Sequence, residues 1–292
     1  MSPNHPNILV TGASGQLGQL VLAELLASVP AARIAATVRT PQAASRLAAL
    51  GVAARLADYD QPESFAAALA GIERVLLISS NAIGRRGVQH RAVIAAARRA
   101  GVGLLAYTSV LHADTSPLGL AAEHRETESD LRESGVPFVL LRNGWYTENY
   151  TAAIPAALAH GALLGGAGEG RIAPAARADY AAAAARVLTT TEDVSGRAFE
   201  LAGDTSFTLA EFAAELSRQA GKPIPYVNLP EADHRAALLG AGLPADLAGL
   251  LADSDAGAAK GALFDQSRAL STLIGRPTTP WAAGIAEALA AF

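Results

Sequence analysis

The chain has 292 residues, of which 51% are hydrophobic and 17% are charged, so it can bury a sizeable core. A formal net charge of -4 provides no basic field for nucleic acid, and the absence of cysteine excludes disulfides, thiolate catalysis and cysteine-ligated metal. The polar first residues show no signal peptide, and apolar runs such as 180–188 are too short to span a bilayer. We therefore expect a cytoplasmic globular protein that neither binds nucleic acid nor inserts into a membrane.

The first half of the chain alternates short apolar runs with helical patterns, starting with a strand over 7–11 and a helix over 16–28. This alternation with short turns predicts an α/β fold, a doubly wound parallel sheet of Rossmann type, whose ligands bind beyond the carboxyl ends of the strands. The further strands are expected at 34–38, 52–57, 75–79, 104–109 and 138–141, and the helices at 41–50, 62–69, 88–100 and 120–134.

After residue 150 the pattern loosens. The expected elements are a helix over 179–189, a strand over 198–201, a helix over 209–220, a strand over 224–228 and short helices from 231 onward. We interpret the glycine-rich stretch 165–170 as a surface loop. The chain is thus expected to form an NADP-binding domain over 1–150 and a smaller C-terminal α+β substrate lobe over 151–292.

The turn between the first strand and the first helix carries three glycines at a spacing of three. In that context Gly12 permits a tight turn, Gly15 admits a pyrophosphate close to the backbone, and Gly18 lets the helix pack closely on the strand. The alternative is an ordinary strand–helix turn. We predict a dinucleotide phosphate site, formed by Gly12, Ala13, Ser14, Gly15, Gln16, Leu17 and Gly18.

The end of the second strand indicates which dinucleotide is bound. An NAD site usually has a carboxylate there for the ribose diol, whereas this chain has Arg39, whose guanidinium can hold a 2′-phosphate. The sequence therefore favours NADPH, with a solvated arginine as the alternative. Asp58 and Tyr59, after the third strand, are candidates to border the adenine, although Asp58 could equally be a local turn acceptor.

Several segments resemble one branch of a known superfamily. The loop from Thr11 to Gly18 resembles the short-chain dehydrogenase/reductases, in their atypical, NmrA-like branch. The segments that resemble its NAD(P)H:quinone oxidoreductases of type 2 are 76–80, 106–109, 111–120, 141–146, 148–150, 177–181, 252–255 and 273–278.

This resemblance implies hydride transfer from NADPH to a quinone without a flavin. It also implies which residues would line the nucleotide. The loop of the glycines and Arg39 would hold the phosphates, and Ile78, Ser79 and Ser80 would lie along the nucleotide after the fourth strand. The residues implied at the nicotinamide end, after the sixth strand, are Asn143, Gly144, Trp145, Tyr146, Thr147 and Glu148.

The chain departs from the wider superfamily at its proton relay. Most of those dehydrogenases use a Tyr-x-x-x-Lys pair, in which the lysine lowers the tyrosine pKa. This chain has two lysines, Lys222 and Lys260, and neither follows a tyrosine by four residues. Where the pair would fall we find Leu120 and His124. Reduction of a quinone does not need this pair, because water can protonate the hydroquinone anion that forms when the quinone takes up a hydride.

The candidates for the acceptor site are Tyr146, Trp145 and His112. Tyr146 and Trp145 belong to an aromatic group with Tyr150 in a chain that has only 5% aromatic residues, and a flat acceptor could stack on their rings. The alternative is that Trp145 is core and Tyr150 covers the junction of the two lobes. His112 could hydrogen-bond a carbonyl, or be a satisfied loop residue.

The remaining histidines are expected to be structural. We place His124, with Glu123 and Glu128, on a solvated helix face, and His90 and His160 on helix surfaces. No histidine or carboxylate pair has metal-site spacing, so we predict no metal.

Two other functions remain open at this point. One is a non-catalytic NADP(H) sensor that acts through a protein partner. The other is an epimerase or a reductase of another small molecule, which would normally need the missing Tyr-x-x-x-Lys pair. A homo-oligomer is compatible with the sequence, which names no particular quinone.

Overall fold

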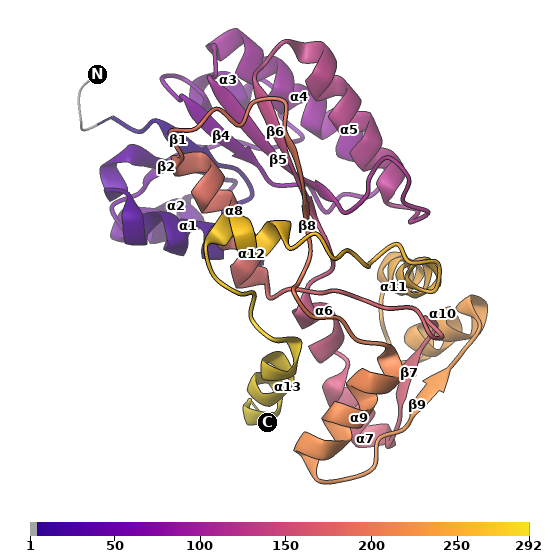
Figure 1. Ribbon diagram of the computed structural model, residues 1–292. Helices are drawn as coiled ribbons and strands as arrows, with labels where there is room; N and C mark the ends of the chain where they lie inside the picture. Colours follow the sequence, from indigo (N-terminus) through magenta and orange to yellow (C-terminus); the bar gives the residue numbers. More distant parts are fainter. Residues whose placement is uncertain (1–4, 292) are drawn as a thin grey trace. The chain divides into compact units, whose positions relative to one another are not determined.

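The computed structural model describes residues 5–291 and contains a seven-stranded sheet in the order β3-β2-β1-β4-β5-β6-β8 (Figure 1). β1 pairs in parallel with β2 and β4, β2 with β3, and β4 with β5. The chain therefore winds outward from β1 in both directions, and the prediction of a doubly wound, Rossmann-like sheet is confirmed. The strands are β1 (Ile8–Val10), β2 (Ile34–Val38), β3 (Ala53–Leu56), β4 (Arg74–Leu77), β5 (Leu104–Val110), β6 (Phe138–Asn143) and β8 (Ala198–Leu201).

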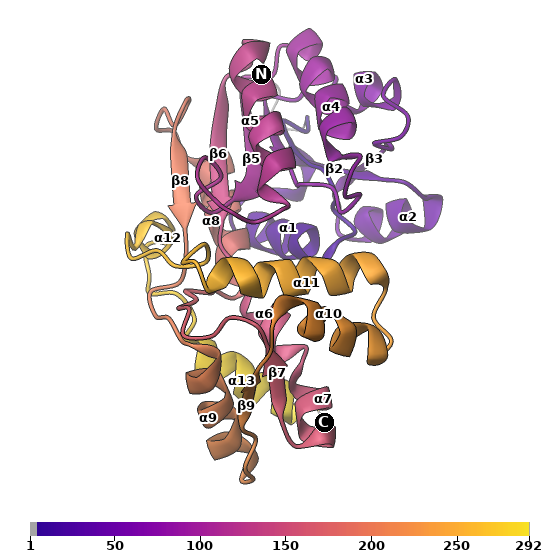
Figure 2. The same ribbon diagram turned by 90° about the vertical axis from the view of Figure 1, so that its right-hand side faces the viewer.

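Helices cover both faces of this sheet. In both views α3, α4 and α5 lie on one face, and α1, α2 and α8 lie on the other (Figures 1 and 2). All residues of β1, β2 and β5 are buried, as expected for parallel strands between two helical layers. These helices are α1 (Gln16–Ser28), α2 (Pro41–Ala49), α3 (Ser64–Ala68), α4 (Arg86–Ala100), α5 (Ala121–Ser134) and α8 (Arg177–Thr189).

The chain forms two compact units. The first comprises 1–110, 123–142 and 180–199, and the second comprises 111–122, 143–179 and 200–292. The chain thus passes between the units several times.

The second unit is the expected α+β region. Its two short strands, β7 (Leu163–Gly165) and β9 (Tyr226–Asn228), pair in parallel. Within residues 5–291, no helix is long and apolar enough to cross a bilayer. The helices of this unit are α6 (Thr147–Thr151), α7 (Ile154–His160), α9 (Leu209–Ala220), α10 (Glu231–Gly240), α11 (Ala245–Ala258), α12 (Ala269–Ile274) and α13 (Trp281–Ala290).

The glycine-rich stretch 165–170 is not simply a surface loop. Gly165 ends β7 and is buried, and the N–H of Gly166 donates to Asp255 Oδ2 over 2.7 Å. A Cβ on Gly165 would lie 2.5 Å from Leu209 Cδ1. Close packing, rather than a turn, therefore accounts for glycine at residue 165, since a Cβ there would require the Leu209 side chain to shift.

Candidate functional site

The glycine loop turns sharply from β1 into α1. Gly12 has φ +59°, the left-handed region that favours glycine, and its carbonyl accepts the N–H of Gly15 over 3.0 Å. A Cβ on Gly18 would lie 2.4 Å from the Gly12 oxygen and 2.7 Å from Ala13 Cα. Glycine at residue 18 is therefore required for the close approach of helix and loop.

The outer side of the loop is open. Ser14, Gly15 and Gln16 are exposed, and a Cβ on Gly15 would meet only the Gly12 oxygen within 4 Å, at 3.2 Å. α1 begins at this point with no side-chain cap and no acidic residue in its first turn. An anion can thus approach the first N–H groups of α1 and the positive end of its dipole. Ala13, Leu17 and Gly18 are buried, so they could reach such an anion only through their backbone.

Arg39 lies directly after β2 and is exposed. Thr40, which follows it, caps α2 by accepting the N–H of Ala43 over 3.2 Å. The arginine therefore stands between a buried strand and a capped helix, with its side chain open to solvent and to a ligand.

Asp58 and Tyr59 both have structural partners. Asp58 Oδ1 accepts the N–H of Asp60 over 3.1 Å, which is the local turn role considered as its alternative. The Tyr59 phenol points inward to Thr11 Oγ1 at 2.8 Å, and burial raises its pKa to about 12. Contact of either residue with an adenine stays a prediction.

The loop after β4 is held at three successive N–H groups, each by a side chain from a different element. Ile78 donates to Thr11 Oγ1 (3.0 Å), Ser79 to Thr108 Oγ1 (2.8 Å) and Ser80 to His90 Nε2 (3.0 Å). The Ser80 hydroxyl accepts the N–H of Ala82 over 3.1 Å and so closes the turn. This segment is therefore rigidly placed at the same sheet edge as the glycine loop.

Two histidines expected on exposed helix surfaces are in fact buried, so that prediction was wrong for His90 and His124. His90 is 0% exposed and His124 is 6% exposed. His90 Nδ1 lies 2.9 Å from Thr127 Oγ1, and His124 Nδ1 lies 2.8 Å from the Tyr107 hydroxyl. Burial lowers the pKa of each histidine to about 3, so both rings are neutral near pH 7.

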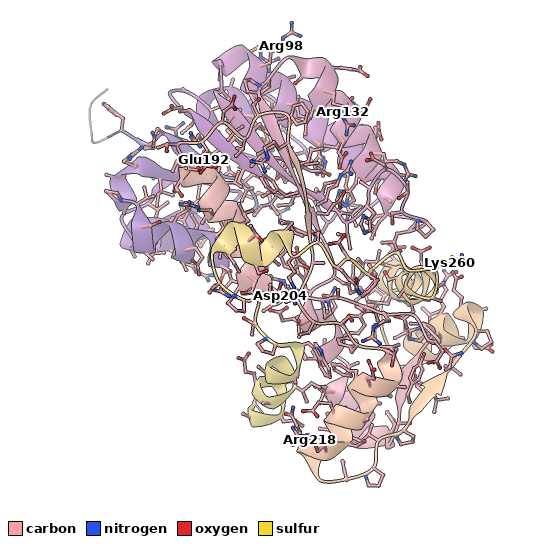
Figure 3. All side chains as sticks on the ribbon, viewed as in Figure 1. Arg98, Arg132, Glu192, Asp204, Arg218 and Lys260 are labelled. Atoms are coloured by element: carbon pink, nitrogen blue, oxygen red, sulfur yellow. The ribbon has the colours of Figure 1, made fainter. Side chains whose placement is uncertain are left out.

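Glu128, also expected on a solvated face, is fully buried. It accepts hydrogen bonds from Ser109 Oγ at 2.6 Å and from Arg142, whose Nη2 lies 2.6 Å and whose Nε lies 2.9 Å from the carboxylate. Arg132, labelled in Figure 3, is the third residue that donates to this carboxylate, over 3.0 Å. The Arg132 side chain is 48% exposed. The carboxylate is therefore a structural anchor that links α5 to β5 and β6.

The candidates Asn143 to Glu148 belong to the second unit. Asn143 and Thr147 are buried, with their side chains directed into the protein, whereas Trp145, Tyr146 and Glu148 are half-buried. Burial raises the pKa of Tyr146, against the opposing effects of Arg177 and a hydrogen bond with Asn143. The Tyr146 and Trp145 rings therefore both have the shape and the partial exposure that a flat ligand needs.

The N–H of Gly144 bonds the carbonyl of Leu201 over 2.7 Å, which fixes the backbone just ahead of Trp145. Tyr150 packs edge to face on Phe207, with ring centroids 5.2 Å apart, and its ring lies near that of Phe212. Tyr150 therefore packs in an aromatic cluster of the second unit.

His112 adopts a left-handed backbone conformation that is uncommon for residues other than glycine, with φ +52°. Its N–H donates to Glu200 Oε2 over 2.8 Å, and its ring Nε2 lies 3.3 Å from the Phe264 oxygen and 3.6 Å from Asp265 Oδ2. The ring is thus clamped between two carboxylates while 31% of the side chain stays exposed.

Sequence reasoning missed Thr108, His90 and Thr127, which hold the loop after β4. The helical period could have predicted the burial of His90, because this residue lies three, four and seven positions before Val93, Ile94 and Ala97 on the buried face of α4. Among the described residues, no group of three or more His, Asp or Glu could hold a metal ion.

Residues 12–191 match the family model described as NAD(P)H-binding. Quinone oxidoreductase 2 of Escherichia coli is 56% identical over 280 residues, which cover 96% of this chain and 98% of that protein.

Two solved structures are also similar over almost their whole length. The crystal structure of the NADPH-dependent quinone oxidoreductase of Escherichia coli, complexed with NADPH, has a TM-score of 0.94 at 56% identity and covers 97% of this chain and 99% of that one. The triphenylmethane reductase of Citrobacter sp., complexed with NADP(H), has a TM-score of 0.92 at 36% identity and covers 97% of this chain and 100% of that one.

Proposed function

The chain belongs to the NAD(P)H-binding family, and we propose that it is an NADPH-dependent quinone oxidoreductase that works without a flavin. Similarity over nearly the full length to the quinone oxidoreductase of Escherichia coli supports both the cofactor and the substrate class. The chemistry must also fit the side chains of this chain, beginning with the nucleotide site.

The first unit fits a phosphorylated dinucleotide. The uncapped start of α1 and the open side of Gly15 suit a pyrophosphate, and the exposed Arg39 suits a 2′-phosphate. The firmly held segment from Ile78 to Ser80 would support the nucleotide at the same edge of the sheet. When bound there, NADPH supplies a hydride.

The observation that carries the proposal concerns the side chains of α5. Related dehydrogenases have the Tyr-x-x-x-Lys pair in the corresponding helix. The buried face of α5 holds His124, which is neutral near pH 7, and Glu128, which is fully engaged with Ser109 and Arg142. Neither group is a Tyr-x-x-x-Lys pair, and that pair is absent from the sequence. The reaction that fits is one that needs no enzymic acid.

Quinone reduction meets this condition. One hydride reduces a quinone to the hydroquinone monoanion, and a proton from water completes the hydroquinone. We propose that the quinone is seated against Tyr146, with Trp145 beside it and the partly exposed His112 as a hydrogen-bond partner of a carbonyl. Because burial raises the pKa of Tyr146, that phenol is a poor proton donor to the anion of another phenol.

The main alternative is a non-catalytic NADP(H) sensor. The test is oxidation of NADPH by the purified, flavin-free protein, with and without added quinones. Quinone-dependent oxidation supports the enzyme, and dinucleotide binding without turnover on several simple quinones supports the sensor.

We also place the protein in the cytoplasm, where NADPH is regenerated, and a homo-oligomer stays a prediction.

A further inference from the structure

A cation lies over the ring proposed to seat the quinone. The guanidinium carbon of Arg177, the first residue of α8, lies 4.4 Å from the centroid of the Tyr146 ring. A guanidinium over an aromatic face is an attractive arrangement that becomes stronger when water is excluded. Both side chains are half-buried, so the pair is held at the edge of the protein interior.

Main-chain hydrogen bonds hold the two segments together. The N–H of Thr147 donates to the carbonyl of Ala175 over 2.9 Å, and the N–H of Ala175 donates to the carbonyl of Trp145 over 3.3 Å. The Glu148 carboxylate accepts the N–H of Arg177 at 2.9 and 3.1 Å. Tyr146 and Arg177 are therefore placed by the backbone, and their stacking is a built feature.

The carboxylate nearest in sequence to Tyr146 bonds the main chain of Arg177. The Glu148 carboxylate bonds the main-chain nitrogen of Arg177, at 2.9 and 3.1 Å, rather than its guanidinium. By contrast Arg276, in the same unit, pairs with Asp179 at 2.6 Å. The Glu148 carboxylate is thus engaged with the main chain of Arg177, and the half-buried guanidinium itself is available to a ligand that carries or acquires negative charge.

We propose that Arg177 stabilises the negative charge that develops on the quinone during hydride uptake, acting across the Tyr146 ring. This inference rests on the proposed function. Hydride transfer moves two electrons and one hydrogen to the quinone and leaves oxidised dinucleotide, so the acceptor becomes an anion before water protonates it. A cation that interacts more strongly with the developing anion than with the neutral quinone lowers the barrier to hydride transfer.

The size of the effect follows from Coulomb's law. A unit charge about 8 Å from the acceptor, at the effective dielectric constant of a partly buried site, changes the rate roughly ten- to thirtyfold. The effect should appear in kcat, because a neutral quinone in the ground state gains little from the charge.

The test compares Arg177→Met, which keeps an unbranched apolar stem but removes the charge, with Arg177→Lys, which keeps the charge. Arg171→Met is the matched control, because Arg171 is an exposed arginine of the same unit that pairs with Glu211 at 3.4 Å. We expect the methionine variant to lose roughly ten- to thirtyfold in kcat, with NADPH affinity unchanged, and the lysine variant and the control to stay within about threefold of wild type. Thermal unfolding checks that each variant is folded.

A binding measurement separates this inference from the proposed function. Ionised 4-nitrophenol mimics the hydroquinone anion, and 4-nitroanisole is its neutral counterpart; both can be titrated by quenching of tryptophan fluorescence. Arg177→Met should weaken binding of the phenolate about tenfold and leave the anisole unchanged. Equal phenolate affinity in wild type and Arg177→Met, equal losses in the lysine and methionine variants, or a loss of NADPH affinity would each overturn the role of Arg177. If wild type bound the phenolate through Arg177 but reduced no quinone, the proposed function would fail while the cation site stood.

Discussion

The backbone N–H of Ser80 donates to Nε2 of His90 over 3.0 Å, so a buried neutral histidine holds the loop that follows β4. Because Nε2 accepts this bond, the hydrogen of the ring belongs on Nδ1, which faces Thr127 Oγ1 at 2.9 Å. Protonation of His90 would turn the acceptor into a donor that faces another donor. The loop therefore depends on the neutral ring.

This dependence predicts a loss of stability in weak acid. The pKa of His90 and of His124 is about 3 in the folded protein, against an ordinary value of 6.5, so only the unfolded chain takes up their protons between these limits. Their contribution is complete above pH 6.5 and falls as the pH is lowered toward 3. Each histidine should lower the free energy of unfolding by up to about 1.4 kcal/mol per pH unit within that range.

Denaturant unfolding between pH 6.5 and 5 measures the slope before most carboxylates titrate. His124→Phe should show a smaller slope than wild type, by up to about one proton, whereas the exposed His160→Ala should match wild type. A slope that is the same in His124→Phe and wild type would show that His124 is not held neutral.

The glycine loop predicts opposite outcomes for two substitutions three residues apart. Gly15 has φ −77° and an open outer side, so Gly15→Val should fold but block the phosphate and abolish NADPH binding. Gly18→Ala should instead destabilise the fold, because its Cβ would lie 2.4 Å from the Gly12 oxygen. NADPH fluorescence titration and thermal unfolding on both variants separate the effects. A folded Gly15→Val protein with undiminished affinity would rule out phosphate binding at this loop.

Arg39 should determine the preference for NADPH. Loss of a hydrogen bond to a charged group costs about 1.5–3 kcal/mol, so Arg39→Ala should weaken NADPH about ten- to a hundredfold and leave NADH nearly unchanged. Arg33→Ala is a suitable control, since Arg33 is an exposed arginine that ends the short 3₁₀ helix before β2. Equal weakening of both dinucleotides would make Arg39 structural.

The elements with strong local signals were predictable. The helix over 16–28 and the strands over 34–38 and 198–201 have the expected bounds, because apolar periodicity and flanking glycine or proline define them locally. The glycine loop could be recognised for the same reason, since its chemistry lies within one strand–turn–helix segment.

Partners distant in sequence could not be predicted in the same way. His90 and His124 were assigned to the surface by residue type, although the helical period puts them on the buried faces of α4 and α5. Polar partners 10 to 37 residues away, such as Thr127 for His90, compensate their burial, and no local pattern reports such pairs. The stacking of Arg177 on Tyr146 likewise depends on main-chain hydrogen bonds between residues 145–147 and Ala175, which are distant in sequence.

Two substitutions of Tyr146 test whether this residue positions the quinone or donates a proton to it. Tyr146→Phe should keep most of the turnover, because the ring face under Arg177 remains, whereas Tyr146→Ala should lose far more, because the acceptor loses its seat. Steady-state kcat and KM for one quinone measure both variants. If phenylalanine were as damaging as alanine, the phenol would be the acid and the acid-free mechanism would be wrong.

The central claim is direct transfer of a hydride from NADPH to a quinone by the protein alone. The most direct measurement is the stoichiometry of NADPH oxidised to quinone reduced, by purified protein whose absorption spectrum shows no flavin. We predict one NADPH consumed for each quinone reduced, with no semiquinone signal in electron paramagnetic resonance. Tight NADPH binding with no quinone-dependent oxidation, or turnover only after flavin is added, would contradict it.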